Sequence, residues 1–433
     1  MTVENLGILD SAFLSGTFVG GGGINSQEIL PRLSTYYPLI YFPKTSLVHN
    51  LSEDKREKLL DNIDNAEKLG IIVSSSFKNT LTKYRNLDNF NFQSFRDNVV
   101  REYTREIQNV KILYDNDFSI QIFPNPFFKG EMYELSKTKG KVKFGITLRG
   151  FGDINFNNNI KIILHILRHE KNMMNKQMRG KYMSLSISPM KERSMVANLI
   201  WNGRVDFVGY VNSFLVDLFS LHRGKAKLYD LFPADASRFK LDKNTVKNRK
   251  QIVFFGRLVP EKGIFEIPFI ARRLKRMGID CNIKVIGKFT FNHDTNIFEK
   301  LSKRLGVENM IEYLGFLPEE DMKSVIGESS IFVNPTHSDA YSIAMLEALS
   351  LRTVVVAYDN PFLLNLYKKV KAVSFVREFH PEAMAEKIAE LLSFDERKIQ
   401  ELFDEETEKF VTFHSSYDVC ADKIKSMIDS ELG

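Results

Sequence analysis

Cysteine is scarce in this chain of 433 residues, which contains only Cys281 and Cys420. Two cysteines so far apart in the sequence support neither a disulfide framework nor a cysteine-based metal site. The N-terminus carries Glu4 and Asp10 and has no basic segment, so it does not resemble a signal peptide. These absences predict a protein of the reducing, cytoplasmic compartment.

The sequence also lacks a long apolar run and a strong excess of one charge. No segment approaches the roughly 20 apolar residues that a membrane-spanning helix requires. The 60 lysines and arginines exceed the aspartates and glutamates by six, a mildly basic balance that is too diffuse to predict nucleic-acid binding. With 43% hydrophobic residues, the chain has a globular composition, and its length predicts two or three domains.

Neither Gly-x-Gly-x-x-Gly nor a Walker A sequence occurs, so the usual fingerprints of dinucleotide and P-loop binding are missing. Instead, four glycines at 20–23 follow an apolar segment and precede a helix-like stretch at 24–33. Such a run predicts a mobile loop that closes over bound phosphate or sugar, with Gly21, Gly22 and Gly23 touching the substrate. A plain flexible connector is the alternative.

Strand-like apolar runs alternate with helix-like stretches along the chain, which predicts parallel α/β structure. Strands are expected at 5–9, 39–42, 70–73, 110–114, 142–147, 252–255, 283–287, 310–315, 331–333, 353–357 and 370–375. A polar run at 240–250 is the expected hinge. It divides the chain into domains 1–240 and 241–411, each predicted to be a doubly wound sheet whose ligands bind beyond the carboxyl ends of the strands.

The first motif that carries chemistry is the turn at 256–263, which reads Gly-Arg-Leu-Val-Pro-Glu-Lys-Gly. Gly256 lets the backbone approach a phosphate, Arg257 offers a planar pair of donors, and Lys262 adds a compact positive charge. Cleavage of a nucleotide sugar leaves negative charge on the diphosphate, so two fixed cations would stabilise that charge without a metal ion. A solvated surface pair is the alternative.

The second motif is a loop that leads from the strand at 331–333 into a helix. Free amide groups near Tyr341, Ser342 and Ile343, at the positive end of the helix dipole, are expected to bind the diphosphate. Asp339 in the loop and Glu347, about two helical turns further along, would then flank the anion. The sugar is expected on one side and the ribose on the other.

Asp339 and Glu347 resemble the Glu-x7-Glu signature of the retaining GT-B glycosyltransferases of family 4, and the turn at 256–263 resembles the other landmark of that family. The resemblance implies two Rossmann-like domains with an interdomain cleft. It also implies transfer of a sugar, with retention and without an essential metal or cofactor, from a nucleotide-diphosphate sugar to a glycan or lipid-linked acceptor. Arg257 and Lys262 would hold the diphosphate, Asp339 would lie near the sugar, and Glu347 would bind the ribose.

The same resemblance implies roles for other positions. Gly315, Phe316 and Leu317 fall where relatives hold the nucleotide base, although a core-facing phenylalanine is as consistent with the sequence. Arg149 belongs to an Arg-Gly pair expected at the floor of the cleft, with a surface turn as the alternative. The amphipathic C-terminal segment at about 412–433 corresponds to a helix that crosses back to the N-terminal domain.

Several alternatives stay open at this stage. The basic and apolar stretch at 160–182 predicts an amphipathic helix packed on its own core, and peripheral contact with the cytoplasmic face of a membrane is the second interpretation. Asp115-Asn116-Asp117 has the form of the GT-A metal motif but is more typical of turns. An idle nucleotide-sugar binding module, a phosphorylase and a nucleotide-sugar epimerase remain rival functions on the same fold.

Overall fold

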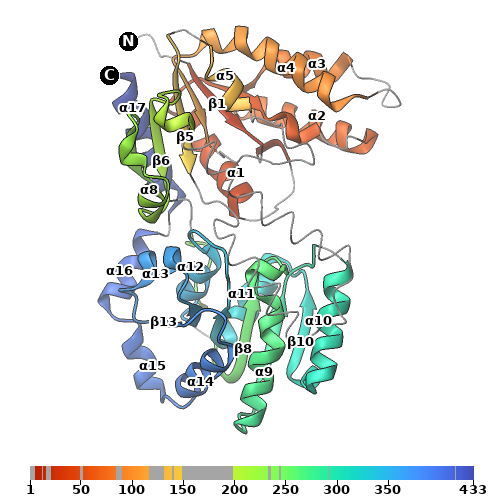
Figure 1. The fold of residues 1–433 in the computed structure, drawn as a ribbon, viewed down its shortest axis with the longest axis vertical. Helices are drawn as coiled ribbons and strands as arrows, with labels where there is room; N and C mark the ends of the chain where they lie inside the picture. Colours follow the sequence, from red (N-terminus) through yellow and green to blue (C-terminus); the bar gives the residue numbers. More distant parts are fainter. Residues whose placement is uncertain are drawn as a thin grey trace. The chain divides into compact units, whose positions relative to one another are not determined.

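The computed structural model describes residues 5–11, 13–15, 21–48, 52–83, 90–116, 131–138, 141–148, 198–232, 236–242, 245–290, 292–414 and 416–433. They form two compact units (Figure 1). The first unit contains the described residues of 1–150, 192–234 and 417–433, and the second contains those of 235–416. Among these residues, no helix has both the length and the apolar character needed to span a membrane.

The described part of the first unit contains one parallel sheet of seven strands in the order β3-β2-β1-β4-β5-β6-β7. The strands are β1 (Leu6–Asp10), β2 (Leu39–Pro43), β3 (Ile71–Val73), β4 (Ile112–Asp115), β5 (Lys143–Leu148), β6 (Phe207–Tyr210) and β7 (Lys227–Asp230). The sequence did not predict β7. This edge strand has exposed polar ends instead of an apolar run, so hydrophobic pattern alone could not reveal it.

The helices of this unit pack on the sheet, and two of them begin with a side-chain cap. They are α1 (Gly21–Ser34), α2 (Glu53–Lys68), α3 (Ser75–Lys83), α4 (Phe92–Glu106), α5 (Glu131–Leu135), α8 (Phe214–Leu218) and α17 (Tyr417–Leu432). The side chains of Ser52 and Asn91 accept hydrogen bonds from backbone amides in the first turns of α2 and α4. Such caps satisfy amides that have no partner within the helix.

The glycine run does not form the expected loop over 21–23. Gly21, Gly22 and Gly23 make the first turn of α1, although glycine is a poor helix former. A tertiary contact compensates, because the buried Ser26 hydroxyl donates to Asp10 Oδ2 over 2.7 Å and ties α1 to the end of β1. The loop prediction is therefore wrong for these three residues, and position 20 lies outside the described residues.

The last helix, α17, returns to the first unit and packs along α1 (Figure 1). Arg32 Nε of α1 lies 2.6 Å from Asp418 Oδ1, at the start of α17. At the other end of the helix, Glu431 is buried and accepts a hydrogen bond of 2.6 Å from the Tyr229 hydroxyl of β7. The prediction that a C-terminal helix crosses back to the N-terminal domain is confirmed.

The described part of the second unit contains a parallel sheet of six strands in the order β10-β9-β8-β11-β12-β13. The strands are β8 (Asn248–Phe255), β9 (Asn282–Ile286), β10 (Ile311–Gly315), β11 (Ser329–Asn334), β12 (Val354–Tyr358) and β13 (Val373–Val376). β8 begins inside the polar run that was expected to be the hinge. Its first three residues are exposed and only its last five are buried, so the apolar pattern did not reveal the start of the strand.

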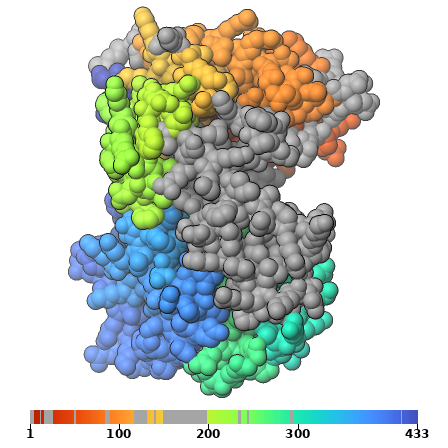
Figure 2. Space-filling model, in the orientation of Figure 1, coloured from red at the N-terminus to blue at the C-terminus, as the bar shows by residue number. Residues whose placement is uncertain are grey.

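The helices of the second unit are α9 (Ile267–Arg276), α10 (Asn292–Leu305), α11 (Glu319–Glu328), α12 (Ile343–Ser350), α13 (Pro361–Tyr367), α14 (Pro381–Leu392), α15 (Glu396–Leu402) and α16 (Glu405–Phe413). In Figure 2 the green-to-cyan segment with α9 and α10 and the blue segment with α13 and α14 form neighbouring parts of the unit's surface. Beneath them the core contains the apolar runs 252–255 of β8 and 331–333 of β11 together with all of β12, as expected for a parallel sheet covered on both faces.

Candidate functional site

Three neighbouring strands of the second unit, β8, β9 and β10, end in glycines with positive φ: Gly256 (139°), Gly287 (142°) and Gly315 (71°). A Cβ atom at Gly287 would lie 2.0 Å from the carbonyl oxygen of Gly256. The backbone segments at these two positions therefore approach more closely than a residue with a side chain would permit. Absence of side chains leaves backbone groups accessible at the carboxyl ends of the strands, where ligands of doubly wound sheets bind.

The turn at 256–263 and the loop after β11 are physically joined. Gly263 has a φ of 78°, and a Cβ atom there would lie 2.0 Å from the carbonyl oxygen of Pro335. The carbonyl oxygen of Glu261 accepts hydrogen bonds from the amides of His337 at 2.9 Å and Ser338 at 3.3 Å. The two sequence motifs therefore form one continuous structure at the carboxyl edge of the sheet.

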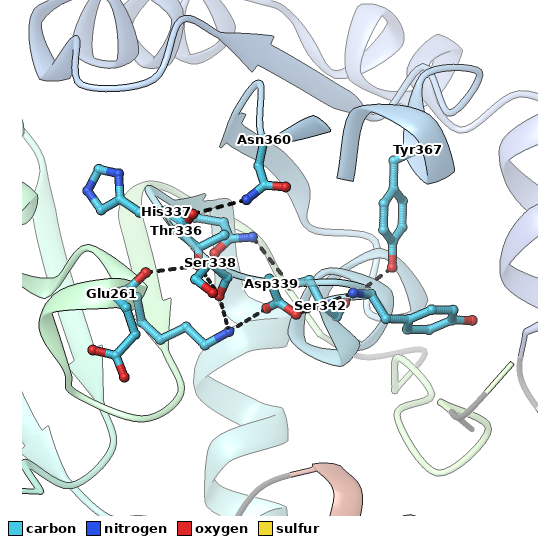
Figure 3. Close-up of polar contacts among 11 residues, drawn as sticks. Glu261, Thr336, His337, Ser338, Asp339, Ser342, Asn360 and Tyr367 are labelled. Carbon is cyan, nitrogen blue, oxygen red and sulfur yellow. Dashed lines mark hydrogen bonds and ion pairs between the residues drawn. The ribbon is translucent and has the colours of Figure 1, made fainter. Parts of the chain in front are cut away.

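Lys262 and Asp339 meet at this junction. Lys262 Nζ lies 2.6 Å from Asp339 Oδ2 and donates a second hydrogen bond of 3.0 Å to the carbonyl oxygen of Ser338 (Figure 3). Each of the two charged side chains is 21% exposed, so the pair remains accessible to a ligand. A cation and a carboxylate that are 77 positions apart in the sequence thus share one surface.

The second oxygen of Asp339 caps the approach to α12. Asp339 Oδ1 accepts hydrogen bonds from the amides of Ser342 at 3.0 Å and Tyr341 at 3.3 Å. Burial alone would raise the pKa of Asp339, but the Lys262 ammonium and the two amides outweigh it and hold the pKa below its usual value. Asp339 is therefore a carboxylate at neutral pH.

The prediction of free amides at 341–343 is thus wrong for Tyr341 and Ser342. The Ile343 amide, by contrast, donates to no acceptor in the described part of the chain. The Tyr341 side chain is also unsuited to ligand contact, because it is buried with its hydroxyl bonded to His414 Nδ1. Ser342 has a strained φ of 55°, and its carbonyl oxygen accepts a hydrogen bond from Tyr367 (Figure 3).

Glu347 lies on α12 and is only 8% exposed. Burial raises its pKa to about 8, the Arg238 guanidinium at 4.0 Å opposes that rise, and Glu319 adds to it. Burial also raises the pKa of Tyr367, and the charges of both Asp339 and Glu347 contribute to the increase. The carboxylates of both motifs therefore lie close enough to the buried Tyr367 hydroxyl to affect its pKa.

The remaining predicted residues are not part of this cluster. Arg257 is exposed, and its side chain makes no hydrogen bond or ion pair with another described residue, so its guanidinium is not brought to Lys262. Phe316 is 75% exposed immediately after β10, which makes it available to a ligand instead of the core, and Leu317 beside it is half-buried. Arg149 and the stretch at 160–182 lie outside the described residues.

The Asp-x-Asp alternative is weakened by the surroundings of Asp115. Its carboxylate forms a buried ion pair with Lys44, with Asp115 Oδ1 2.8 Å from Lys44 Nζ. A carboxylate neutralised in this way is engaged in the fold of the first unit. Within the described residues, no group of His, Cys, Asp and Glu side chains is arranged to hold a metal ion.

Sequence reasoning missed a buried charge cluster behind the Asp339 loop. His337 Nδ1 lies 2.9 Å from Glu378 Oε1, and His337 Nε2 lies 3.4 Å from Glu266 Oε1. Burial lowers the pKa of His337, but the two carboxylates more than compensate and raise it. The three residues come from separate parts of the sequence, so no local pattern could have revealed the cluster.

The two parallel Rossmann-like sheets and the returning helix define the GT-B fold, and solved structures agree. The Anabaena protein HepE, solved with UDP and glucose, superimposes with a TM-score of 0.65 at 12% identity, covering 99% of this chain and 100% of that one. WaaG, a glycosyltransferase of lipopolysaccharide biosynthesis, gives a TM-score of 0.57 at 11% identity, covering 97% of this chain and 98% of that one.

Residues 235–429 match the family of Glycosyl transferases group 1. The predicted resemblance to this family and the predicted fold are therefore confirmed. Alpha-D-kanosaminyltransferase of Streptomyces kanamyceticus is 27% identical over 145 residues, which is 34% of this chain and 37% of that protein. D-inositol 3-phosphate glycosyltransferase of Corynebacterium glutamicum is 27% identical over 154 residues, 35% of this chain and 37% of that protein. The matches thus span little more than a third of these relatives.

Proposed function

We propose that this protein is a glycosyltransferase that moves a hexose from a nucleotide-diphosphate sugar to a hydroxyl of a glycan or lipid-linked acceptor. Transfer would proceed with retention of anomeric configuration and without an essential metal ion. The observation that carries the proposal is the pair of Lys262 and Asp339, 2.6 Å apart and half-buried, where the two motifs join.

The geometry suits stabilisation of a departing diphosphate. Lys262 supplies a fixed positive charge, Arg257 supplies an exposed guanidinium on the same turn, and the Ile343 amide faces no internal acceptor. Charge that develops on the leaving group in the transition state would meet these groups without their having to reorganise far. The diphosphate oxygen, once charged, would accept the proton of the acceptor hydroxyl as the new glycosidic bond forms on the same face.

We propose that the rest of the donor extends along the same edge of the sheet. Glu347 would accept hydrogen bonds from the ribose hydroxyls, and Phe316 and Leu317, which follow Gly315, would contact the base. Asp339 would orient the donor sugar through a carboxylate that stays ionised. The solved relative in complex with UDP and glucose makes a UDP-sugar the first donor to test.

The first unit would bind the acceptor. In this proposal its domain comprises 1–240 together with the returning segment at about 412–433, and the donor domain comprises 241–411. Gly21, Gly22, Gly23 and Arg149 would contact the acceptor or the donor sugar, and the stretch at 160–182 is the candidate for peripheral contact with a membrane that carries a lipid-linked acceptor. The cytoplasm is the proposed site of action.

A thermal-shift screen of UDP-, GDP-, ADP- and dTDP-sugars tests donor binding, because a ligand that binds only the folded state raises its apparent stability. One nucleotide series is expected to raise the melting temperature, and slow hydrolysis of that donor would distinguish an enzyme from an idle binding module. Hydrolysis that persists in EDTA would support the metal-independent mechanism. If no sugar nucleotide shifts the melting temperature at millimolar concentration, the proposal is wrong.

A further inference from the structure

Arg238 is a side chain that the donor site, as described so far, does not use. It lies in the short segment 236–239, at the start of the second unit, where the buried Phe239 anchors the chain in the core. Its Nη1 lies 3.1 Å from Glu319 Oε2, at the first residue of α11, and its Nη2 lies 4.0 Å from Glu347 Oε1 on α12. The guanidinium thus stands between two carboxylates of different helices.

The guanidinium is not fully satisfied by these contacts. Arg238 Nε is buried and has no hydrogen-bond partner among the residues that the structure describes. An unpaired buried donor is unfavourable, so this placement is held by the surroundings at the expense of local stability. The contact to Glu347 is at the limit of an ion pair, and the contact to Glu319 is close. The charge of Arg238 is therefore divided unequally between the two carboxylates.

The ionisation of Glu347 depends on the positive charge of Arg238. Burial raises its pKa to about 8, and Arg238 is the one cation that acts against the increase. The other groups that face it are Glu319, which raises its pKa further and is itself paired with Lys323 at 3.1 Å, and the neutral phenol of Tyr367. A change at Arg238 or Glu319 would therefore alter the fraction of Glu347 that is ionised near neutral pH, in opposite directions.

We propose that Arg238 is a positioning residue for the donor, which orients Glu347 and favours its ionised form, so that the carboxylate accepts hydrogen bonds from the ribose hydroxyls. This inference rests on the proposed function and adds a role for the segment that enters the donor domain. Hydrogen bonds to a charged acceptor are stronger than bonds to a neutral one, so the charge of Glu347 would set how strongly the site prefers ribose.

The test compares the binding of UDP and 2′-deoxy-UDP by calorimetry between pH 7 and 9. Loss of one charge-assisted hydrogen bond corresponds to roughly 10-fold weaker binding of the deoxy compound to the wild-type protein. Arg238→Met is expected to lower that discrimination several-fold and to move the rise in UDP affinity to higher pH. Glu319→Gln removes the competing carboxylate, so it is expected to move the rise to lower pH.

Lys323→Met is the matched control. Lys323 also pairs with Glu319 and also lies over the Phe239 ring, at 5.8 Å against 5.4 Å for Arg238, but it makes no ion pair with Glu347. A purely structural role of this cluster would therefore affect the Lys323 and Arg238 variants alike. The expected result is wild-type discrimination in Lys323→Met.

Unchanged discrimination and an unchanged pH profile in Arg238→Met would overturn the inference while leaving the proposed function intact. Should that variant fail to fold, Glu319→Gln decides the matter, since the 40% exposed Glu319 side chain can be replaced without disturbing the core. A profile that does not move, or moves to higher pH, would then overturn it. If the wild-type protein binds no nucleotide at all, the proposed function itself has failed.

Discussion

Lys262 is the single charge on which the proposed chemistry depends most directly. Its ammonium is held by Asp339 and by the carbonyl oxygen of Ser338. A diphosphate carries more negative charge than this carboxylate, so it would compete for the same cation. The two contacts fix the position of Lys262, and a fixed cation needs little reorganisation to stabilise charge in the transition state.

Replacement of this cation tests its role at the residue scale. Lys262→Ala, and separately Arg257→Ala, are expected to lower kcat by about 10²–10³, the usual effect of removing one stabiliser of developing negative charge. Steady-state release of the nucleoside diphosphate measures the effect. The exposed Lys300 of α10 provides the control, since Lys300→Ala is expected to leave kcat unchanged. Full turnover in both site variants would contradict the mechanism.

The raised pKa of Glu347 predicts how the free energy of unfolding depends on pH. Its folded-state pKa of about 8 lies above the ordinary value of 4.5, so between these values the folded protein holds a proton that the unfolded chain releases. The free energy of unfolding therefore falls as the pH rises through this interval and levels off above it. Glu347→Gln removes that loss because glutamine does not titrate.

The melting temperature of Glu347→Gln, relative to the wild-type protein, is expected to increase from pH 5 to pH 8.5. The exposed Glu401 of α15 serves as the control, and Glu401→Gln should follow the wild-type curve. Scanning calorimetry at matched ionic strength measures the difference. Parallel curves for Glu347→Gln and wild type would show that the carboxylate is not perturbed by burial.

At the scale of elements, the site depends on close approach between two turns. Gly263 allows the turn at 256–263 to rest on Pro335, and the carbonyl oxygen of Glu261 then accepts from the amides of the next loop. These backbone contacts, more than side-chain packing, keep Lys262 next to Asp339. A residue with a side chain at 263 would separate the two motifs.

Gly263→Ala is accordingly expected to destabilise the protein by more than the roughly 1–2 kcal/mol that a left-handed backbone costs an alanine. Gly278→Ala is the matched control, because Gly278 has a similar φ of 73° but no atom within 4 Å of the new Cβ position. The control should lose only the backbone penalty and keep its activity. Urea unfolding and kcat measure both variants, and equal losses would argue against the role assigned to the contact with Pro335.

At the scale of the whole molecule, the chain leaves the first unit, forms the second and returns through α17. Glu431 fastens the returning helix, since its side chain is 2% exposed and accepts from Tyr229 at 2.6 Å and Lys227 at 3.1 Å. Both partners belong to β7, the edge strand of the sheet. These contacts therefore tie the end of α17 to the edge strand of the sheet.

Glu431→Ala is expected to destabilise the first unit by about 1–2 kcal/mol, because the hydrogen bond from the half-buried Tyr229 hydroxyl is lost while the lysine partners remain hydrated. Asp418→Ala on the same helix removes an exposed ion pair with Arg32 and should cost less than about 1 kcal/mol. Urea unfolding of the full chain compares the two variants. A larger loss in Asp418→Ala would contradict the role given to Glu431.

The sequence by itself determined the strands of both sheets apart from β6 and β7, the parallel α/β class, the family resemblance and the residues of the two motifs. Each of these follows from patterns within about ten residues: apolar runs set strands, glycines set sharp turns, and a loop before helix formers sets a helix start. The returning helix could also be anticipated from its amphipathic pattern together with the family resemblance.

Only the tertiary structure decided how the motif residues are used. It directed the Asp339 carboxylate to Lys262 and to the amides expected to be free, placed Arg238 between Glu319 and Glu347, and put Glu266 and Glu378 on His337. Apart from the bonds of Asp339 to the nearby amides, each of these contacts joins residues that are distant in the sequence. The strength of a charge interaction depends on distance and burial in three dimensions, which no local pattern of residues specifies.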